Sequence, residues 1–224
     1  MICRPFVALA IVARIQAFNH PNPLFRTATA RYMSSTSPEV ATKRVLVPIG
    51  DGSEEIETTC ITDTLTRFGA KVTVASVMSS LVCTMSRGIK VMADVSIDEA
   101  SKESWDLIAL PGGMPGAEHL RDSVSLIAML NKQKSEGKMY AAICASPAIV
   151  LASKGLDVEG ITCYPAPSFR GVLKHPVDDD VVVTSNLITS QGPGTSLQFA
   201  LQLGEQLFGK EKADEIAVQM LVKR

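Results

Sequence analysis

The segment around Cys144 carries the clearest indication of chemistry in this sequence. Residues 139–143 have the composition of a buried strand, Cys144 follows them directly, and Pro147 stands where a helix would begin. Small residues at Ala142 and Ser146 allow a sharp strand-to-helix turn, which is the arrangement of a nucleophile elbow with cysteine in place of serine. Such a turn places the sulfur at a helix N-terminus, whose partial positive charge lowers a thiol pKa. The functional interpretation is a reactive nucleophile, and the alternative is a buried structural cysteine.

A second candidate is Glu57, which lies near the start of a predicted helix over residues 54–68. The other residues on its helical face are apolar: Ile61, Leu65 and Phe68. A carboxyl group that faces the core would have a raised pKa and could stay protonated. Glu54 and Glu55 are explained by the favourable interaction of acidic groups with the first turn of a helix, and the same role is the alternative for Glu57.

Glycine turns and two arginines could complete an anion-binding site. Gly112 and Gly113 follow a predicted strand, and their backbone N–H groups could hold an oxyanion or simply form a tight turn. The glycine turn at residues 50–52 lacks the third glycine of a dinucleotide fingerprint, which argues against nucleotide binding. Arg67 and Arg87 could provide an anion pocket, and a solvated surface charge is the simpler interpretation of each.

The elements that must position these residues alternate between strands and helices. Strands are predicted at residues 44–49, 71–77, 105–110 and 139–143, with a hairpin at 181–184 and 187–190. Further helices are predicted at residues 117–135, from 147, at 195–208 and at 212–221. Strands that are apolar on both faces and alternate with helices indicate an α/β fold with a mostly parallel sheet covered on both sides. Ligands of such folds bind at the carboxyl ends of the strands, where residues 50–57, 111–116 and 144–147 fall.

Composition narrows the class of protein. The 224 residues carry a net charge of -1 and are 46% hydrophobic, which indicates a packed domain and not the basic surface of a nucleic-acid binder. No apolar run approaches the roughly 18 residues that span a bilayer. The 5 cysteines include no C-x-x-C pair, which favours free thiols in a reducing compartment. The 3 histidines lack the spacing of a metal site, and no cofactor is expected.

Residues 1–38 differ from the rest of the chain. They contain arginines but no acidic residue, and hydroxyl residues gather near their end. This composition favours an organelle transit peptide, with mitochondrial import as the first choice and residues 39–224 as the single domain. A plastid, the secretory route and a disordered tail on a cytosolic protein are the alternatives.

Four segments, in this order, resemble the ThiJ/PfpI superfamily, in the branch of the parkinsonism-associated deglycase and the glyoxalase III-like proteins. The segments are Gly52–Thr58 (GSEEIET), Leu110–Gly113 (LPGG), Ala141–Pro147 (AAICASP) and Thr189–Thr195 (TSQGPGT). The resemblance covers about residues 43–223. It implies a flavodoxin-like three-layer sandwich that is usually a homodimer.

The resemblance also implies roles for individual residues. Cys144 matches the nucleophile of the family, and Glu57 matches its protonated partner. The other residues that fall in or near the implied substrate site are Gly112, Gly113, Ala145, Arg67 and Arg87. Gly113 and the backbone of Ala145 correspond to the oxyanion site.

Two departures from the family pattern bear on the chemistry. Tyr164 stands where several members have a histidine, so a phenol could donate a hydrogen bond where they transfer a proton. Ala145 stands where the peptidase-type members have a histidine, so no Cys-His dyad is visible and proteolysis is disfavoured.

The activity that the resemblance implies is the glutathione-independent conversion of methylglyoxal or glyoxal into a 2-hydroxy acid. The same chemistry extends to the release of early glycation adducts from proteins. The main alternative is a non-enzymatic, redox-sensing stress chaperone in which Glu57 stabilises the sulfinate of Cys144. A peptidase or amidase is the weaker alternative.

Overall fold

The computed structural model of the protein describes residues 42–224. These residues form an α/β fold with a large sheet and a separate two-stranded hairpin. The predicted transit peptide, residues 1–38, lies outside the described residues. Within residues 42–224, no helix is long and apolar enough to cross a membrane.

The large sheet is mostly parallel, as predicted. Its 7 strands have the order β5-β2-β1-β6-β7-β9-β8. They are β1 (Arg44–Ile49), β2 (Lys71–Ser76), β5 (Val95–Ser96), β6 (Leu107–Leu110), β7 (Met139–Ile143), β8 (Val181–Thr184) and β9 (Leu187–Ser190). Every neighbouring pair is parallel except β8 and β9, which form the predicted antiparallel hairpin.

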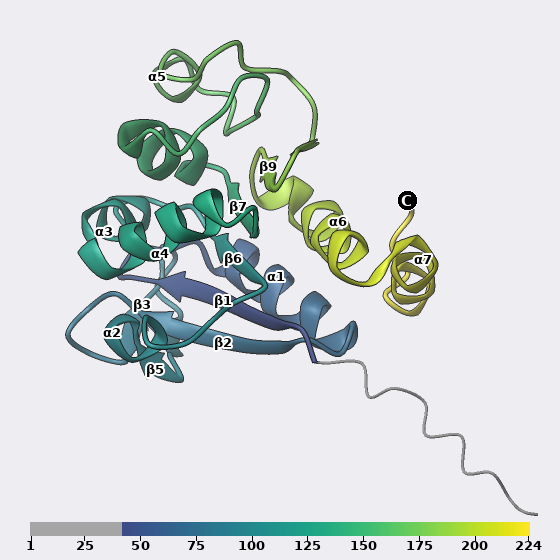
Figure 1. Ribbon diagram of the computed structural model, residues 1–224, viewed down its shortest axis with the longest axis horizontal. Coiled ribbons are helices and arrows are strands. Elements are labelled where there is room, and N and C mark those ends of the chain that lie inside the picture. The colour runs from purple at the N-terminus through teal and green to yellow at the C-terminus, as the bar shows by residue number, and fades with distance from the viewer. Residues whose placement is uncertain (1–41) are drawn as a thin grey trace, which may run out of the picture. The chain divides into compact units, whose positions relative to one another are not determined.

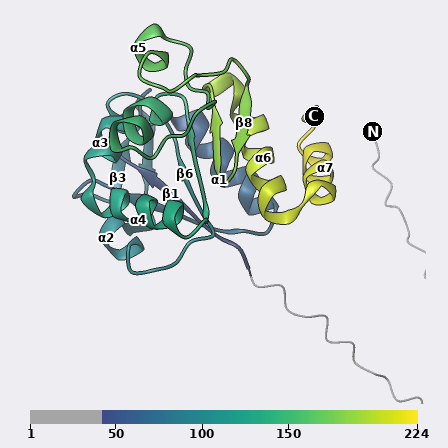
Figure 2. The same cartoon turned by 45° about the horizontal axis from the view of Figure 1, so that its top comes forward.

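Helices cover both faces of this sheet (Figures 1 and 2). One layer holds α1 (Glu55–Arg67) and α6 (Ser196–Phe208), with α7 (Lys210–Gln219) packed on α6. The other holds α2 (Ile97–Ala100), α3 (Gly116–Asp122), α4 (Val124–Ser135) and the short π-helix η1 (Pro147–Leu151). Alternate residues of β1 point toward opposite helical layers. Val45 and Val47 pack with α1 and α6, whereas Leu46 packs with α3 and α4. The fold is therefore the predicted three-layer, flavodoxin-like sandwich.

Two local features differ from the sequence prediction. The helix predicted over residues 117–135 is divided at Ser123, whose backbone is extended (φ -76°, ψ 106°) and whose side chain accepts a hydrogen bond from the N–H of Leu126. An unpredicted hairpin, β3 (Val82–Thr84) and β4 (Lys90–Met92), follows β2. Each of its strands has only 3 residues, which is too short for an alternating pattern to mark a strand in the sequence.

Three segments that follow strands meet at the carboxyl edge of the sheet. β6 is hydrogen-bonded to β1 on one side and to β7 on the other. The loop after β1 contacts the loop after β6, where the N–H of Glu54 donates to the carbonyl of Gly112 at 3.0 Å. Residues 50–57, 111–116 and 144–147 are thereby brought to one place.

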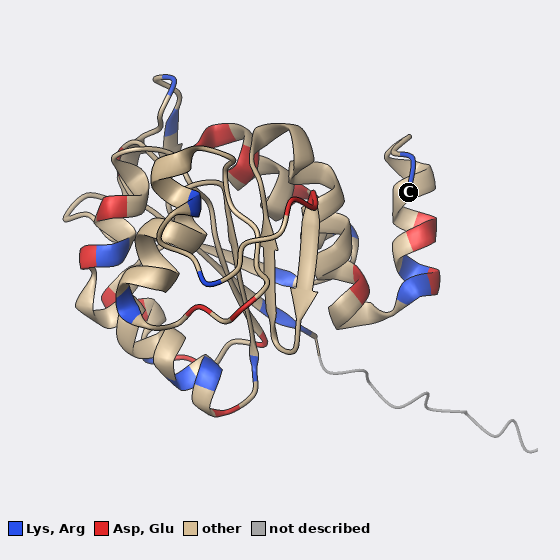
Figure 3. Ribbon diagram, turned by 90° about the horizontal axis from the view of Figure 1, so that it is seen from above, with Lys and Arg blue, Asp and Glu red and all other residues tan. Residues whose placement is uncertain are grey.

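Charged side chains are spread over the surface. Figure 3 shows acidic and basic segments interspersed on the helices and loops of the described chain.

The contact between α1 and α6 depends on one glycine. A Cβ atom added at Gly204 in α6 would lie 2.2 Å from the ring of Phe68, which follows α1 and is 4% exposed. The absence of a side chain at residue 204 lets the two helices approach with the aromatic ring between them.

We predict that Gly204→Ala lowers the free energy of unfolding. Overpacking a core costs about 1–3 kcal/mol, which outweighs the gain of up to ~1 kcal/mol from replacing a helical glycine. Urea denaturation measures the difference. Gly194→Ala is the control, since a Cβ atom at residue 194 meets nothing within 4 Å. A Gly204→Ala protein as stable as the wild type would contradict this packing argument.

Candidate active site

Cys144 lies on a sharp turn directly after β7. Its φ of 63° is in the left-handed region, which a side chain other than glycine adopts only at a cost of about 1–3 kcal/mol. Two hydrogen bonds hold this conformation: its N–H donates to the carbonyl of Ser190 at 3.0 Å, and its carbonyl accepts from the N–H of Tyr164 at 2.8 Å. Backbone strain that is held in place beside an accessible sulfur is a feature of functional sites.

Glycines allow the neighbouring loop to approach this turn closely. A Cβ atom at Gly112 would lie 2.7 Å from Cβ of Cys144, and one at Gly113 would lie 2.4 Å from the carbonyl oxygen of Gly52. Gly113 also has a φ of 85°, which favours glycine. Larger residues at these two positions would push the loop away from the sulfur.

Two backbone N–H groups are directed at the sulfur of Cys144. The N–H groups of Gly113 and Ala145 both form hydrogen bonds that lower the pKa of the thiol. An oxyanion site requires donors at this position. If a substrate carbon were bonded to the sulfur, the oxygen on that carbon would lie near both N–H groups.

Glu57 lies in the first turn of α1 and is completely buried. Its Oε2 accepts a hydrogen bond from the N–H of Gly112 at 2.6 Å. Its Oε1 is also buried and has no well-formed hydrogen bond to any described residue, although the Cys144 thiol is close enough to affect its pKa. Burial of this carboxyl group raises the pKa of Glu57 to about 7, in spite of the Gly112 hydrogen bond.

Glu57 and Cys144 act as a coupled pair. Burial, together with the nearby carboxylate charge of Glu57, raises the pKa of the Cys144 thiol to about 12. The predicted lowering by a helix N-terminus is therefore not the dominant effect, because η1 is a single short turn and the sulfur is largely desolvated. The repulsive part acts only when Glu57 is ionised, so a protonated Glu57 leaves the sulfur free to carry the one negative charge of the pair.

A cavity of about 420 Å³ opens above Cys144. Its lining residues are Glu54, Ser86, Arg87, Gly113, Met114, Cys144, Ala145, Tyr164, Phe169 and Pro193. Of these, Gly113, Cys144, Ala145, Tyr164 and Arg87 are among the residues predicted for the site, whereas Gly112 and Glu57 lie beneath it. The sequence prediction missed Glu54, Ser86, Met114, Phe169 and Pro193.

Glu54 and Glu55 have structural roles beyond the helix dipole. Glu54 caps α1 by accepting a hydrogen bond from the N–H of Glu57 at 2.8 Å. Glu55 holds the hairpin loop, accepting from the hydroxyl of Ser86 and the N–H of Arg87, both at 2.7 Å. These hydrogen bonds fix Arg87 at the rim of the cavity.

Arg67 does not contribute to the cavity of this chain. It lies at the C-terminal end of α1, ten residues and roughly 15 Å along the helix from Glu57. It forms an exposed ion pair with Asp63 at 2.8 Å. Within the described chain Arg67 is thus outside the cavity, and its place in an anion pocket stays a prediction.

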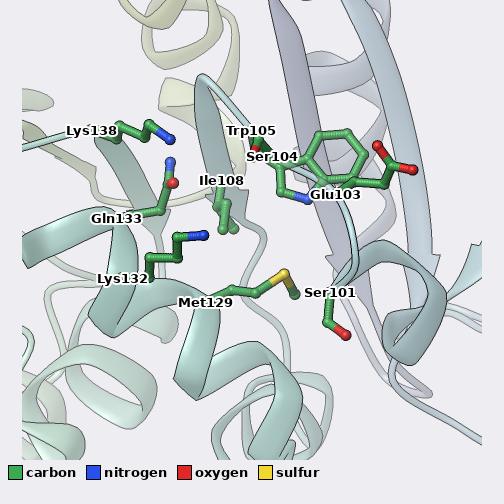
Figure 4. A pocket seen from close by; sticks show the side chains of 9 residues that line it. All are labelled: Ser101, Glu103, Ser104, Trp105, Ile108, Met129, Lys132, Gln133 and Lys138. Carbon is green, nitrogen blue, oxygen red and sulfur yellow. The ribbon is translucent and has the colours of Figure 1, made fainter. Parts of the chain in front are cut away.

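A different hollow, shown in Figure 4, lies at the opposite edge of the sheet. It is lined by Trp105 and Lys138, which precede β6 and β7, and its volume is only about 30 Å³. That volume holds about one water molecule. Residues 42–224 also contain no group of three or more His, Cys, Asp or Glu side chains that could hold a metal ion.

A strained, accessible cysteine at the carboxyl edge of a parallel sheet, with a buried acid beneath it, defines an α/β protein with a cysteine nucleophile elbow. Within that class the chain belongs to the DJ-1/PfpI family, whose sequence profile matches residues 43–206. The resemblance seen in the sequence motifs is confirmed.

Individual relatives agree with this assignment. "Protein DJ-1 homolog B" of Arabidopsis thaliana is 47% identical over 182 residues, which are 81% of this chain and 42% of that protein. "Glutathione-independent glyoxalase DJR-1.2" of Caenorhabditis elegans is 34% identical over 77% of this chain and 91% of its own length. The structure entitled "Toxoplasma gondii DJ-1, oxidized" superposes with a TM-score of 0.77 at 45% identity, covering 82% of this chain and all of that one. The chain thus spans less than half the length of the Arabidopsis relative.

The buried carboxyl group predicts a pH-dependent stability. The pKa of Glu57 is about 7 in the folded protein against 4.5 for a free side chain, so this group favours the fold at low pH and the benefit is lost as pH rises through 7. The shift corresponds to a loss of about 3 kcal/mol between pH 4 and pH 8. Glu57→Gln has no ionisable group at this position, so its free energy of unfolding should rise by about this amount relative to the wild type between pH 4 and pH 8.

Chemical denaturation at pH 4, 6 and 8 measures this difference. Cys60→Ser, one turn further along α1, is the matched control and should keep the wild-type pH dependence. A Glu57→Gln protein whose stability follows the wild type in parallel at all three pH values would show that Glu57 titrates normally.

Proposed function

We propose that the protein is a cysteine-dependent glyoxalase that converts 2-oxoaldehydes into 2-hydroxy acids without glutathione. The observation that carries the proposal is the pairing of an accessible, strained Cys144 with a completely buried Glu57. The raised pKa of Glu57, about 7, suits a group that must give and take a proton near neutral pH.

The first step joins sulfur to the aldehyde. The Cys144 sulfur attacks the aldehyde carbon, the carbonyl π electrons move to oxygen, and a proton from the Cys144–Glu57 pair completes a hemithioacetal. The N–H groups of Gly113 and Ala145 stabilise the negative charge that develops on this oxygen.

The second step moves a proton between the two carbons. Glu57, now a carboxylate, removes the proton from the former aldehyde carbon, and the C–H electrons form an enediolate whose negative charge lies on the former ketone oxygen. Glu57 returns that proton to the adjacent carbon, the hydroxyl proton of the hemithioacetal moves to the former ketone oxygen, and a 2-hydroxy thioester is left on Cys144. Water then cleaves the C–S bond, releases the 2-hydroxy acid and restores the thiol, so that the net reaction is addition of one water to the oxoaldehyde.

The relatives support the same reaction class. The Caenorhabditis elegans protein named a glutathione-independent glyoxalase is matched by this chain over 91% of its length, which includes the region of the candidate site. Release of early glycation adducts from proteins uses the same attack on a carbonyl-derived carbon, and we include it as an extension of the proposal.

We predict that Cys144→Ser abolishes conversion of methylglyoxal to lactate. Loss of a covalent nucleophile should lower kcat by more than about 10³-fold. Chiral analysis of lactate, formed by purified protein in buffer without added thiols, measures this. Cys60→Ser, which changes a half-buried cysteine outside the cavity, should retain activity. Substantial lactate formation by the Cys144→Ser protein would refute the proposal.

The protonation state of Glu57 predicts the sign of a pKa change. Glu57 helps to raise the pKa of the Cys144 thiol, so Glu57→Leu, which removes the carboxyl group, should lower this pKa. Thiolate absorbance at 240 nm, followed against pH, measures the change.

Glu57→Gln is the matched control for this titration, because its amide keeps an N–H donor without the ionisation. It should lower the pKa as well, because it also removes the negative charge. A rise in pKa in Glu57→Leu would instead show that the protonated carboxyl group stabilises the thiolate, and an unchanged pKa would place Glu57 outside the site.

A further inference from the structure

Four of the side chains that line the cavity above Cys144 are apolar or aromatic. They are Met114, Tyr164, Phe169 and Pro193. Tyr164 is 45% exposed and Met114 is 43% exposed, so both leave apolar surface in contact with water beside a reactive sulfur. Such surface within a pocket is typically where the apolar part of a ligand binds.

The aromatic part of this lining is held in place before any ligand arrives. The rings of Tyr164 and Phe169 meet edge to face, with centroids 6.3 Å apart and planes at 76°. The backbone N–H of Tyr164 donates to the carbonyl of Cys144, which ties the ring to the nucleophile. Gly192 leaves room for it, because a Cβ atom there would lie 3.3 Å from Cδ2 of Tyr164.

The lining also includes the polar residues Glu54, Ser86 and Arg87, of which the last two belong to the hairpin loop that Glu55 holds. An apolar substituent on a substrate bound at Cys144 is favoured next to Tyr164 and Phe169, because contact with the polar residues would remove water from them without compensation.

The size of the cavity exceeds the needs of the smallest substrates. Methylglyoxal has five non-hydrogen atoms and would fill on the order of 150 Å³, if each atom takes the roughly 30 Å³ that a water molecule occupies in the liquid. By the same reckoning an aryl-substituted oxoaldehyde with ten such atoms fills about 300 Å³. The cavity offers about 420 Å³.

We propose that the aromatic wall formed by Tyr164 and Phe169 binds the substituent of the substrate, so that the site prefers aryl-substituted 2-oxoaldehydes to methylglyoxal. This inference rests on the proposed function. The overall reaction has the same stoichiometry, because phenylglyoxal and one water molecule give mandelate.

The first test compares kcat/KM for phenylglyoxal and for methylglyoxal in the wild type and three variants. The wild-type ratio should favour phenylglyoxal, and Phe169→Ala and Tyr164→Ala should each lower that ratio about tenfold, the usual effect of removing part of a hydrophobic pocket. Tyr164→Phe keeps the ring and should keep the ratio. Val172→Ala, in the same chain segment but outside the cavity, is the control for both substrates.

A ratio that favours methylglyoxal in the wild type, or one that neither alanine variant changes, would overturn the inference while leaving the glyoxalase proposal intact. Failure of the wild type to convert either aldehyde would instead count against the proposed function.

The second test does not depend on turnover. Mandelate and lactate are titrated into the Cys144→Ser protein, and binding is followed by the NMR signals of the aromatic side chains. Mandelate should bind at least tenfold more tightly than lactate and shift the signals of Tyr164 and Phe169, and Phe169→Ala should remove most of this difference. Equal affinity for the two acids would reject the aromatic wall as a binding surface.

Discussion

The close approach of two backbone turns is the constraint on which the rest of the site depends. The turn at Gly112 and Gly113 lies so near Cys144 that a single added carbon would collide with it. This contact is possible because β6 and β7 are adjacent and parallel, so that both chains leave the sheet at the same edge. The same loop also contacts α1, because the N–H of Gly112 donates a hydrogen bond to the Glu57 carboxyl group. One loop thus fixes the N–H of Gly113, Cys144 and Glu57 relative to each other.

This arrangement is maintained against two local costs. Cys144 has a left-handed backbone, and Glu57 is a carboxyl group without access to water. Both are compensated by the surrounding core, in which the central strands are completely buried between two helical layers. A less rigid sheet would let the turn relax and would admit water to the Glu57 carboxyl group, and water would return the pKa of Glu57 toward its ordinary value.

Much of the framework could be predicted from sequence because it is local. Buried strands, the helix that carries Glu57 and the turn at Cys144 are each marked by a run of adjacent residues. The wall residue Phe169 could not be found in this way. It lies on α5 (Pro167–Arg170), in a segment without periodicity, and it is near the site through its ring contact with Tyr164, whose N–H is hydrogen-bonded to the carbonyl of Cys144. The break at Ser123 was missed because one capping hydroxyl interrupts an otherwise continuous helical pattern. The role of Arg67 stays a prediction, because family resemblance identifies the helix that carries it but not what its exposed side chain binds.

The hydrogen bond from Cys144 to Ser190 has a consequence for the order in which the protein becomes reactive. Its acceptor lies in β9, 46 residues after the cysteine, and β9 also completes the sheet beside β7. During synthesis the ribosome therefore releases Cys144 long before the strand that stabilises its strained conformation exists. Until β9 is in place, the cysteine is free to adopt an ordinary extended backbone, away from the N–H groups of Gly113 and Ala145. In the nascent chain Cys144 therefore has an ordinary backbone and surroundings, and it reaches its strained conformation only when the domain is nearly complete.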